Sequence, residues 1–161
     1  MPRLLDLEIG TGWLVLRIVA GVLLSAVVFF FLSYVPSNLP LLISKFMPPD
    51  LPDALGQIVS SLVHPFLPFL GAIVSASVFL EVLFRKTKAY GPALIFAGLA
   101  STLYVYFAFQ GGIITVVLPR EFTMEVQVVA SLDITPIMVL CMLPTLLTVL
   151  RGAVMSFSRK R

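Results

Sequence analysis

Residues 13–34 read WLVLRIVAGVLLSAVVFFFLSY, and this stretch decides the fold class. Its only charged side chain is that of Arg17, and a helix of this length crosses the ~30 Å hydrocarbon core of a bilayer at about 1.5 Å per residue. A secretory signal peptide has a shorter apolar core and ends in small residues, whereas Phe29, Phe30, Phe31 and Leu32 stand at that position. We therefore expect a retained transmembrane helix.

The composition of the whole chain points to the same class. Of 161 residues, 59% are hydrophobic and 12% are charged, against roughly 25% charged in soluble domains, and the mean hydropathy is +1.06. A soluble domain of this length has too little interior for so many apolar side chains, which excludes a soluble enzyme. One cysteine and one histidine exclude a disulfide framework, a cysteine-rich metal or iron–sulfur site and bis-histidine haem ligation by this chain alone, so we expect no cofactor and no metal.

Three more apolar stretches predict further spans at about 66–84, 92–110 and 134–157. Residues 36–64 are predicted to form an interfacial loop with a helix at about 54–64, because prolines such as Pro36 and Pro40 interrupt a regular helix. Pro144, inside the last span, predicts a kink.

The segment between the third and fourth spans changes in character. Residues 113–117 and 126–129 are β-branched runs around Pro119, which predicts a short external β-hairpin over 113–129. The alternative is a third helix that continues to Leu118, since glycine is tolerated in transmembrane helices. The predicted fold is thus an all-α integral membrane protein, a four-transmembrane-helix bundle in a single domain over residues 1–161.

The loop charges orient the predicted bundle. Lys45 and Arg120 fall on one side of the membrane, and the other nine basic residues fall on the opposite side: Arg3, Arg17, Arg85, Lys86, Lys88, Arg151, Arg159, Lys160 and Arg161. Because Lys and Arg resist translocation, we expect both termini inside the cell. The basic excess then reflects membrane topology and contact with lipid headgroups, and we expect no nucleic-acid partner.

Arg17, Glu81 and Arg151 form a candidate intramembrane charge cluster. Each lies one or two turns inside the same predicted membrane boundary, so Glu81 is expected within ion-pair reach of one of the arginines. One interpretation is a buried ion pair that fixes helix packing, with the arginines reaching toward the headgroups. The other is a cation or proton step, or an anion site, at the cytoplasmic mouth.

Other side chains give weaker signals. His64 has no carboxylate or cysteine at metal-ligand spacing and is expected to be a polar interface residue, and Cys141 is expected to be inert packing. Four aromatic residues near the outer end of the third span predict an interfacial belt on which a quinone or lipid headgroup could stack: Tyr104, Tyr106, Phe107 and Phe109. No catalytic residues are predicted, because no nucleophile–base pair is visible.

Small residues recur at four-residue spacing in the second and third spans. They are Gly71 with Ser75, Ala72 with Ala76, Ala93 with Ala97, and Gly98 with Thr102. Such faces allow helix backbones to approach closely in lipid. The spacing leaves open whether the partner helix belongs to this chain.

Residues 14–21, LVLRIVAG, resemble the opening of the DoxX/DoxD family of small four-helix membrane proteins, which begins with a Leu-rich Arg-x-x-x-Gly helix. The span around Gly71 and the basic turn at residues 85–89 are similar to that family's second helix and cytoplasmic turn. The likeness covers about a third of the chain, and the family's acidic residue early in the second helix is absent, because Pro68 and Phe69 stand there. The resemblance implies a membrane subunit of a quinone-linked complex.

The leading functional hypothesis is a non-catalytic subunit or scaffold of a larger, respiratory membrane complex, partnered by the lipid bilayer and by other subunits or further copies of the chain. The alternative is a small homo-oligomeric transporter or channel for an ion or small solute. An enzyme ranks third. We expect a multi-pass protein of a prokaryotic cell membrane, and the low content of Asn, Gln and Cys hints at a thermophile.

Overall fold

The computed structural model describes residues 11–46, 63–118 and 128–158, and most of them are helical. The elements in chain order are α1 (Thr11–Phe29), the π-helix η1 (Phe30–Tyr34), α2 (Val35–Phe46), α4 (Leu67–Phe84), α5 (Tyr90–Ala108), the 3-10 turn η2 (Gln110–Gly112), β1 (Ile113–Leu118), β2 (Val128–Asp133) and α6 (Thr135–Ser158). Four helices are long and apolar enough to cross a membrane: Gly12–Leu39, Leu67–Phe84, Tyr90–Ala108 and Thr135–Ser158. The prediction of four such helices is confirmed.

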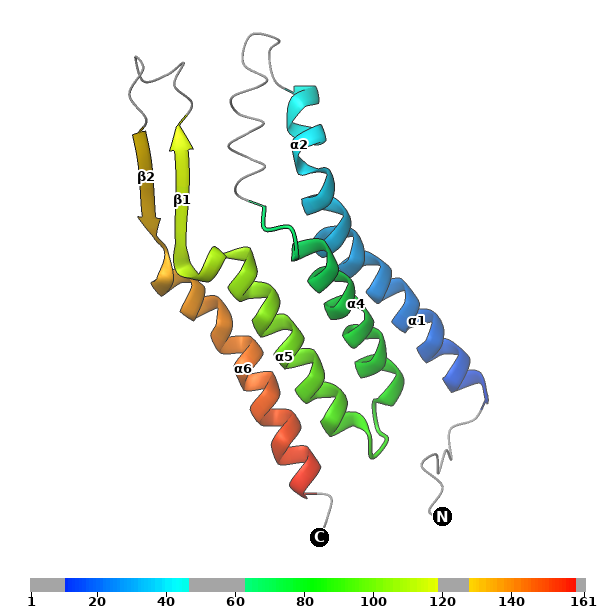
Figure 1. Ribbon diagram of the computed structural model, residues 1–161. Coiled ribbons are helices and arrows are strands. Elements are labelled where there is room, and N and C mark those ends of the chain that lie inside the picture. The colour runs from blue at the N-terminus through cyan, green and yellow to red at the C-terminus, as the bar shows by residue number, and fades with distance from the viewer. Residues whose placement is uncertain (1–10, 47–62, 119–127, 159–161) are drawn as a thin grey trace.

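The four long helices lie side by side in the order of the chain, α1, α4, α5 and α6 (Figure 1). The start of α1, the turn between α4 and α5 and the end of α6 lie together at one end of the row, which we call the basic end. The two strands and α2 lie at the other end, the hairpin end. Each long helix makes its main contacts with its neighbours in the chain.

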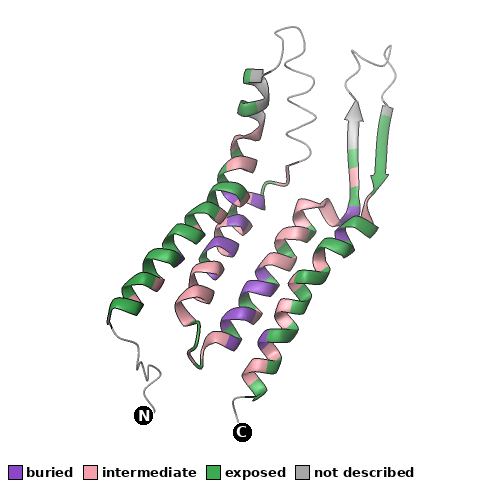
Figure 2. Ribbon diagram, turned by 180° about the vertical axis from the view of Figure 1, so that it is seen from behind, coloured by how far each residue is buried: buried purple, intermediate pink, exposed green. Residues whose placement is uncertain are grey.

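The two inner helices of the row, α4 and α5, are more buried than the two outer helices, α1 and α6 (Figure 2). In the most apolar windows of α4 and α5, 33% of residues are buried, against 6% in the first span and 11% in α6. The fully buried side chains of Leu94 and Ser77 lie on α5 and α4. The four predicted helices are present, and in the described residues they form an open row with α1 and α6 as its outer members rather than a bundle in which all four share one core.

The first helix does not end at Tyr34, so the loop predicted from residue 36 is wrong over residues 36–46. The chain stays helical through Pro36 and Pro40, because η1 widens the turn just before Pro36 and the main-chain N–H of Val35 bonds to the carbonyl of Phe30. A wider turn relieves the clash between a proline ring and the carbonyl four residues earlier. Side chains bond to other carbonyls of this region, Ser37 to Ser33 at 2.7 Å and Asn38 to Tyr34 at 2.8 Å. Residues 47–62, which include most of the predicted interfacial helix, lie outside the described residues.

The predicted hairpin is confirmed, and the alternative of a longer third helix is wrong. Helix α5 ends at Ala108, and Gln110, Gly111 and Gly112 all have positive φ, which breaks the helix and leads the chain into β1. β1 pairs antiparallel with β2, from Ile113 opposite Asp133 to Leu118 opposite Val128. The loop 119–127 lies outside the described residues. The other helix bounds agree with the prediction to within two residues, and α6 runs on through Pro144.

Candidate functional site

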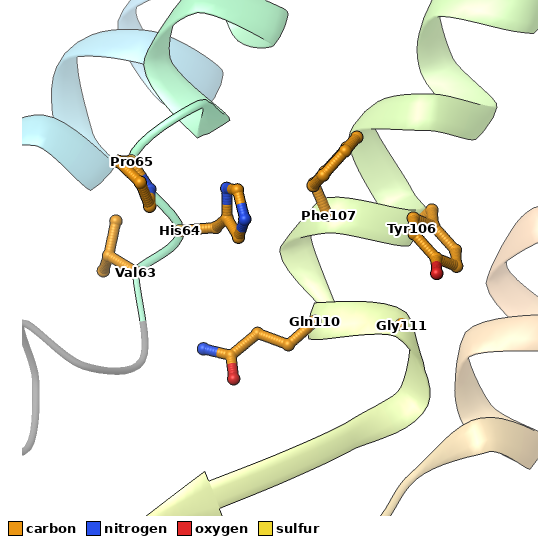
Figure 3. A pocket seen from close by; sticks show the side chains of 7 residues that line it. All are labelled: Val63, His64, Pro65, Tyr106, Phe107, Gln110 and Gly111. Carbon is orange, nitrogen blue, oxygen red and sulfur yellow. The ribbon is translucent and has the colours of Figure 1, made fainter.

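A cavity of about 540 Å³ opens at the hairpin end between the start of α4 and the end of α5 (Figure 3). Its walls come from Val63, His64 and Pro65 before α4, and from Tyr106, Phe107, Gln110 and Gly111 at the end of α5. The turn at positive φ that ends α5 also places Gln110, whose side chain extends past His64 on the open side. Two segments 40 residues apart in sequence thus build one polar and aromatic pocket.

His64 is the central polar group of this cavity. Its half-buried ring lies 4.8 Å, between centroids, from the ring of Phe107 and 5.6 Å from that of Phe66. Nδ1 accepts the main-chain N–H of Phe66 at 3.3 Å, so in the neutral ring Nε2 carries the proton and can donate. Within the described ranges no three His, Cys, Asp or Glu side chains gather, so His64 has no partners there for a metal site. It is a hydrogen-bonding group in an aromatic setting.

The residues of the predicted aromatic belt have two different roles, cavity lining and helix packing. Tyr106 and Phe107 line the cavity, with their rings edge to face at 5.5 Å. Tyr104 instead reaches across to the π-helix, where its hydroxyl donates to the carbonyl of Leu32 at 3.2 Å. Leu32 is the residue four before Pro36, which has no N–H to offer that carbonyl. Tyr104 is therefore a packing residue, and the cavity can hold a flat group against Phe107 with polar contacts to His64.

At the basic end, Arg17 is anchored to the end of α4. Its half-buried guanidinium donates from Nη1 to the carbonyl of Arg85 at 2.7 Å, and its Cζ lies 6.0 Å from the centroid of the Trp13 ring. The carbonyls at a helix C-terminus have no partner within the helix and carry partial negative charge, so a guanidinium is a suitable donor to them. This contact joins the start of α1 to the turn between α4 and α5.

The structure does not join the three residues of the predicted charge cluster. Glu81 is half-buried on α4 and Arg151 is exposed on α6, and among the described residues no ion pair within 4.0 Å links Glu81 to Arg17 or Arg151. Arg17 meets the Arg85 carbonyl instead. The residues that do gather with the two arginines are Arg85 and Lys86, which line one cavity with Arg17 and a second with Arg151.

Sequence reasoning used Arg85 and Lys86 for topology and did not consider them as site residues. The available signal was their position directly after an apolar span, where a short turn must bring them toward the neighbouring helices. Cys141, expected as packing, is exposed on α6. It faces away from the rest of the chain because α6 is an outer helix of the row.

In comparisons with known proteins, no family model, no curated protein and no solved structure matches the chain.

Proposed function

We propose that the chain is a multi-pass integral membrane protein of a prokaryotic cell membrane. In the proposed orientation the basic end, where α1 begins and α6 ends, faces the cytoplasm. Four long apolar helices support insertion. The charge distribution supports the orientation, because Arg17, Arg85, Lys86, Lys88 and Arg151 lie toward the basic end and Lys45 lies at the hairpin end.

Within that membrane, the proposed role is that of a non-catalytic subunit or scaffold of a larger complex. The observation that carries this proposal is the open row: α1 and α6 each pack along one side only, and large apolar side chains on both remain exposed, among them Leu23, Leu140 and Leu147 at 63%, 67% and 63%. Apolar side chains facing lipid are normal, but a helix held on one side has a free flank on which another subunit can pack.

The small-residue faces do not support a partner subunit, because Gly71 and Gly98 already pack against helices of the same chain. Gly71 lies against the backbone of Leu32 and Ser33, and Gly98 lies against that of Thr145 and Val149. For Gly71 and Gly98, the partner helices left open by the sequence pattern are therefore η1 and α6 of the same chain.

We further propose that this complex is quinone-linked, and two features support that part of the proposal. One is the resemblance of residues 14–21 to the DoxX/DoxD family. The other is the hairpin-end cavity, where Phe107 offers a stacking face and His64 offers an N–H for the carbonyl edge of a flat ring.

A transporter or channel is the weaker alternative. The cavities described above lie at the two ends of the row. Midway along the helices, polar side chains bond to each other, Ser25 to Ser75 at 2.9 Å and Thr102 to Thr145 at 2.8 Å, which leaves them engaged in helix packing. A polar path through this chain would therefore need a second copy to complete it.

Native mass spectrometry of the tagged chain, extracted from its own membranes in mild detergent, tests the subunit proposal. A stoichiometric complex with one or more different membrane proteins is the expected result. A homo-oligomer that also conducts ions or small solutes in liposomes would favour the alternative. A chain that is monomeric both after extraction and in lipid nanodiscs would contradict both.

A further inference from the structure

A second cleft lies at the basic end, between α1 and the turn that joins α4 to α5. It has a volume of about 380 Å³, and we call it the α1–turn cleft. Its walls are of two kinds: Arg17, Arg85 and Lys86 are cationic, while Trp13, Leu16 and Val82 are apolar. A cleft whose walls combine cationic and apolar side chains matches an amphiphile with an anionic headgroup.

Among the described residues, the charged side chains that line the cleft are all cationic, namely Arg17, Arg85 and Lys86, and Glu81 is not one of the lining residues. Arg17 uses one N–H on the Arg85 carbonyl at 2.7 Å, which fixes the guanidinium and leaves further donors on the same group for a ligand. Like charges held together repel one another, and an anion between them removes that repulsion. Arginine in particular presents paired donors to a phosphate.

The backbone at Lys86 is the second, independent observation. Lys86 has a φ of 72°, a conformation that glycine adopts freely and lysine adopts at a cost. The turn is held in this form by two bonds to the Phe84 carbonyl, from the N–H of Thr87 at 2.9 Å and from its hydroxyl at 2.8 Å. A lysine at a position that suits glycine places an ammonium group at the cleft, which glycine could not do.

We propose that the α1–turn cleft binds the phosphate of an anionic phospholipid, with Arg17, Arg85 and Lys86 around the phosphate and the start of an acyl chain along Leu16 and Val82. Trp13 suits this depth, because tryptophan is enriched where headgroups meet hydrocarbon, and basic pockets between transmembrane helices are known headgroup sites. A zwitterionic lipid gains less, since none of the described residues that line the cleft offers a carboxylate to its ammonium group. The inference rests on the proposed membrane insertion and orientation and not on the proposed subunit role.

The test is a lipid titration of the purified full-length chain in mild detergent, followed by native mass spectrometry with phosphatidylglycerol and with phosphatidylcholine. We expect tighter binding of phosphatidylglycerol. Lys86→Asn keeps a residue that tolerates positive φ and removes the charge, so it should weaken phosphatidylglycerol binding about fivefold with an unchanged thermal midpoint. Lys88→Asn is the matched control, because Lys88 is exposed in the same turn but lines neither of the two cavities at the basic end. It should change the affinity less than about twofold.

Three outcomes would overturn the proposal. Equal affinity for the two lipids would remove the headgroup selectivity, and equal losses in Lys86→Asn and Lys88→Asn would assign the binding to general surface charge. Displacement of phosphatidylglycerol by millimolar inorganic phosphate would assign the site to a free anion. The titration uses the isolated chain, so its result is independent of whether a partner subunit is found.

Discussion

Where α6 packs on α5, glycines on both helices let two α-helical backbones touch. Where the first helix packs on α4, a glycine of α4 meets the π-helix η1. A Cβ on Gly152 would lie 2.8 Å from the carbonyl oxygen of Gly91, and a Cβ on Gly98 would lie 2.9 Å from that of Thr145. A Cβ on Gly71 would collide with the carbonyl of Leu32 in the π-helix.

The difference shows two ways to bring apolar helices close without a large core. The α5–α6 interface needs only small residues in register, which is the common solution in lipid. The α1–α4 interface adds the effect of Pro36, whose missing N–H frees a carbonyl that Tyr104 of α5 then binds at 3.2 Å. The irregular turn therefore ties the first helix to both α4 and α5 at the hairpin end.

The largest expected effect comes from filling the space beside the π-helix. Gly71→Leu forces a side chain into the backbone of Leu32 and Ser33, which has little freedom to move, so we expect a loss of about 3 kcal/mol or more in stability. Thermal unfolding in detergent measures it. Gly12→Leu is the control, because nothing lies within 4 Å of a Cβ at Gly12. Equal behaviour of the two variants would show that η1 does not pack on α4 at Gly71.

A smaller effect is expected at the regular interface. Gly98→Ala places a methyl group 2.6 Å from the Cγ2 of Val149 and 2.9 Å from the Thr145 carbonyl oxygen. The side chain of Val149 can rotate in part, so we expect a destabilisation of about 1–3 kcal/mol, compared with Gly12→Ala in the same assay. A stabilised Gly98→Ala variant would mean that α5 and α6 lie further apart than described.

The polar pairs sharpen the comparison further. Ser25 and Ser75 bond between α1 and α4, and Thr102 and Thr145 bond between α5 and α6. Double-mutant cycles with Ser→Ala and Thr→Val should each give a coupling of about 0.6 kcal/mol and no more than about 1.7 kcal/mol, as expected for side-chain hydrogen bonds between transmembrane helices. A coupling near zero in one cycle would identify that interface as the looser of the two.

The smallest effect concerns the start of α6. Asp133 Oδ1 accepts the main-chain N–H of Thr135 at 2.9 Å, and the hydrogen bonds from the side chain and backbone of Thr135 lower the pKa of Asp133 below its ordinary value of 3.8. A lowered folded-state pKa stabilises the fold above the ordinary value, and the contribution is lost as pH falls through the folded pKa. The thermal midpoints of the natural chain and Asp133→Asn should therefore converge below about pH 4. A midpoint difference that stays constant with pH would contradict this.

Much of the fold followed from hydropathy alone. Runs such as residues 66–84 and 134–157 are long enough to cross a bilayer, and the β-branched runs after Gly111 and Gly112 indicated the hairpin. The helix through Pro36 and Pro40 was not predicted, because proline usually interrupts a regular helix. The helix continues past Pro36 because the turn before it is wide. The side chains of Ser37 and Asn38 also donate hydrogen bonds to main-chain carbonyls of this region.

The site was less predictable. Depth along a helix can be read from sequence, and it placed Arg17, Glu81 and Arg151 near one end of the row. The direction in which a side chain points cannot be read from the sequence. Arg17 donates to the carbonyl of Arg85 rather than pairing with Glu81. His64 and Phe107 also come together only because α4 and α5 are antiparallel neighbours, which no local pattern specifies.

The open row is the central claim, and a single distance tests it. Cys141 is the chain's one cysteine and is exposed on α6, so a spin label there and a second on Val27→Cys of α1 report the separation of the outer helices by pulsed electron resonance in lipid nanodiscs. Three helix-to-helix steps of about 8–10 Å predict roughly 20–30 Å. A single population in which the two labelled helices are adjacent, about 10 Å apart, would show a closed bundle and contradict the account.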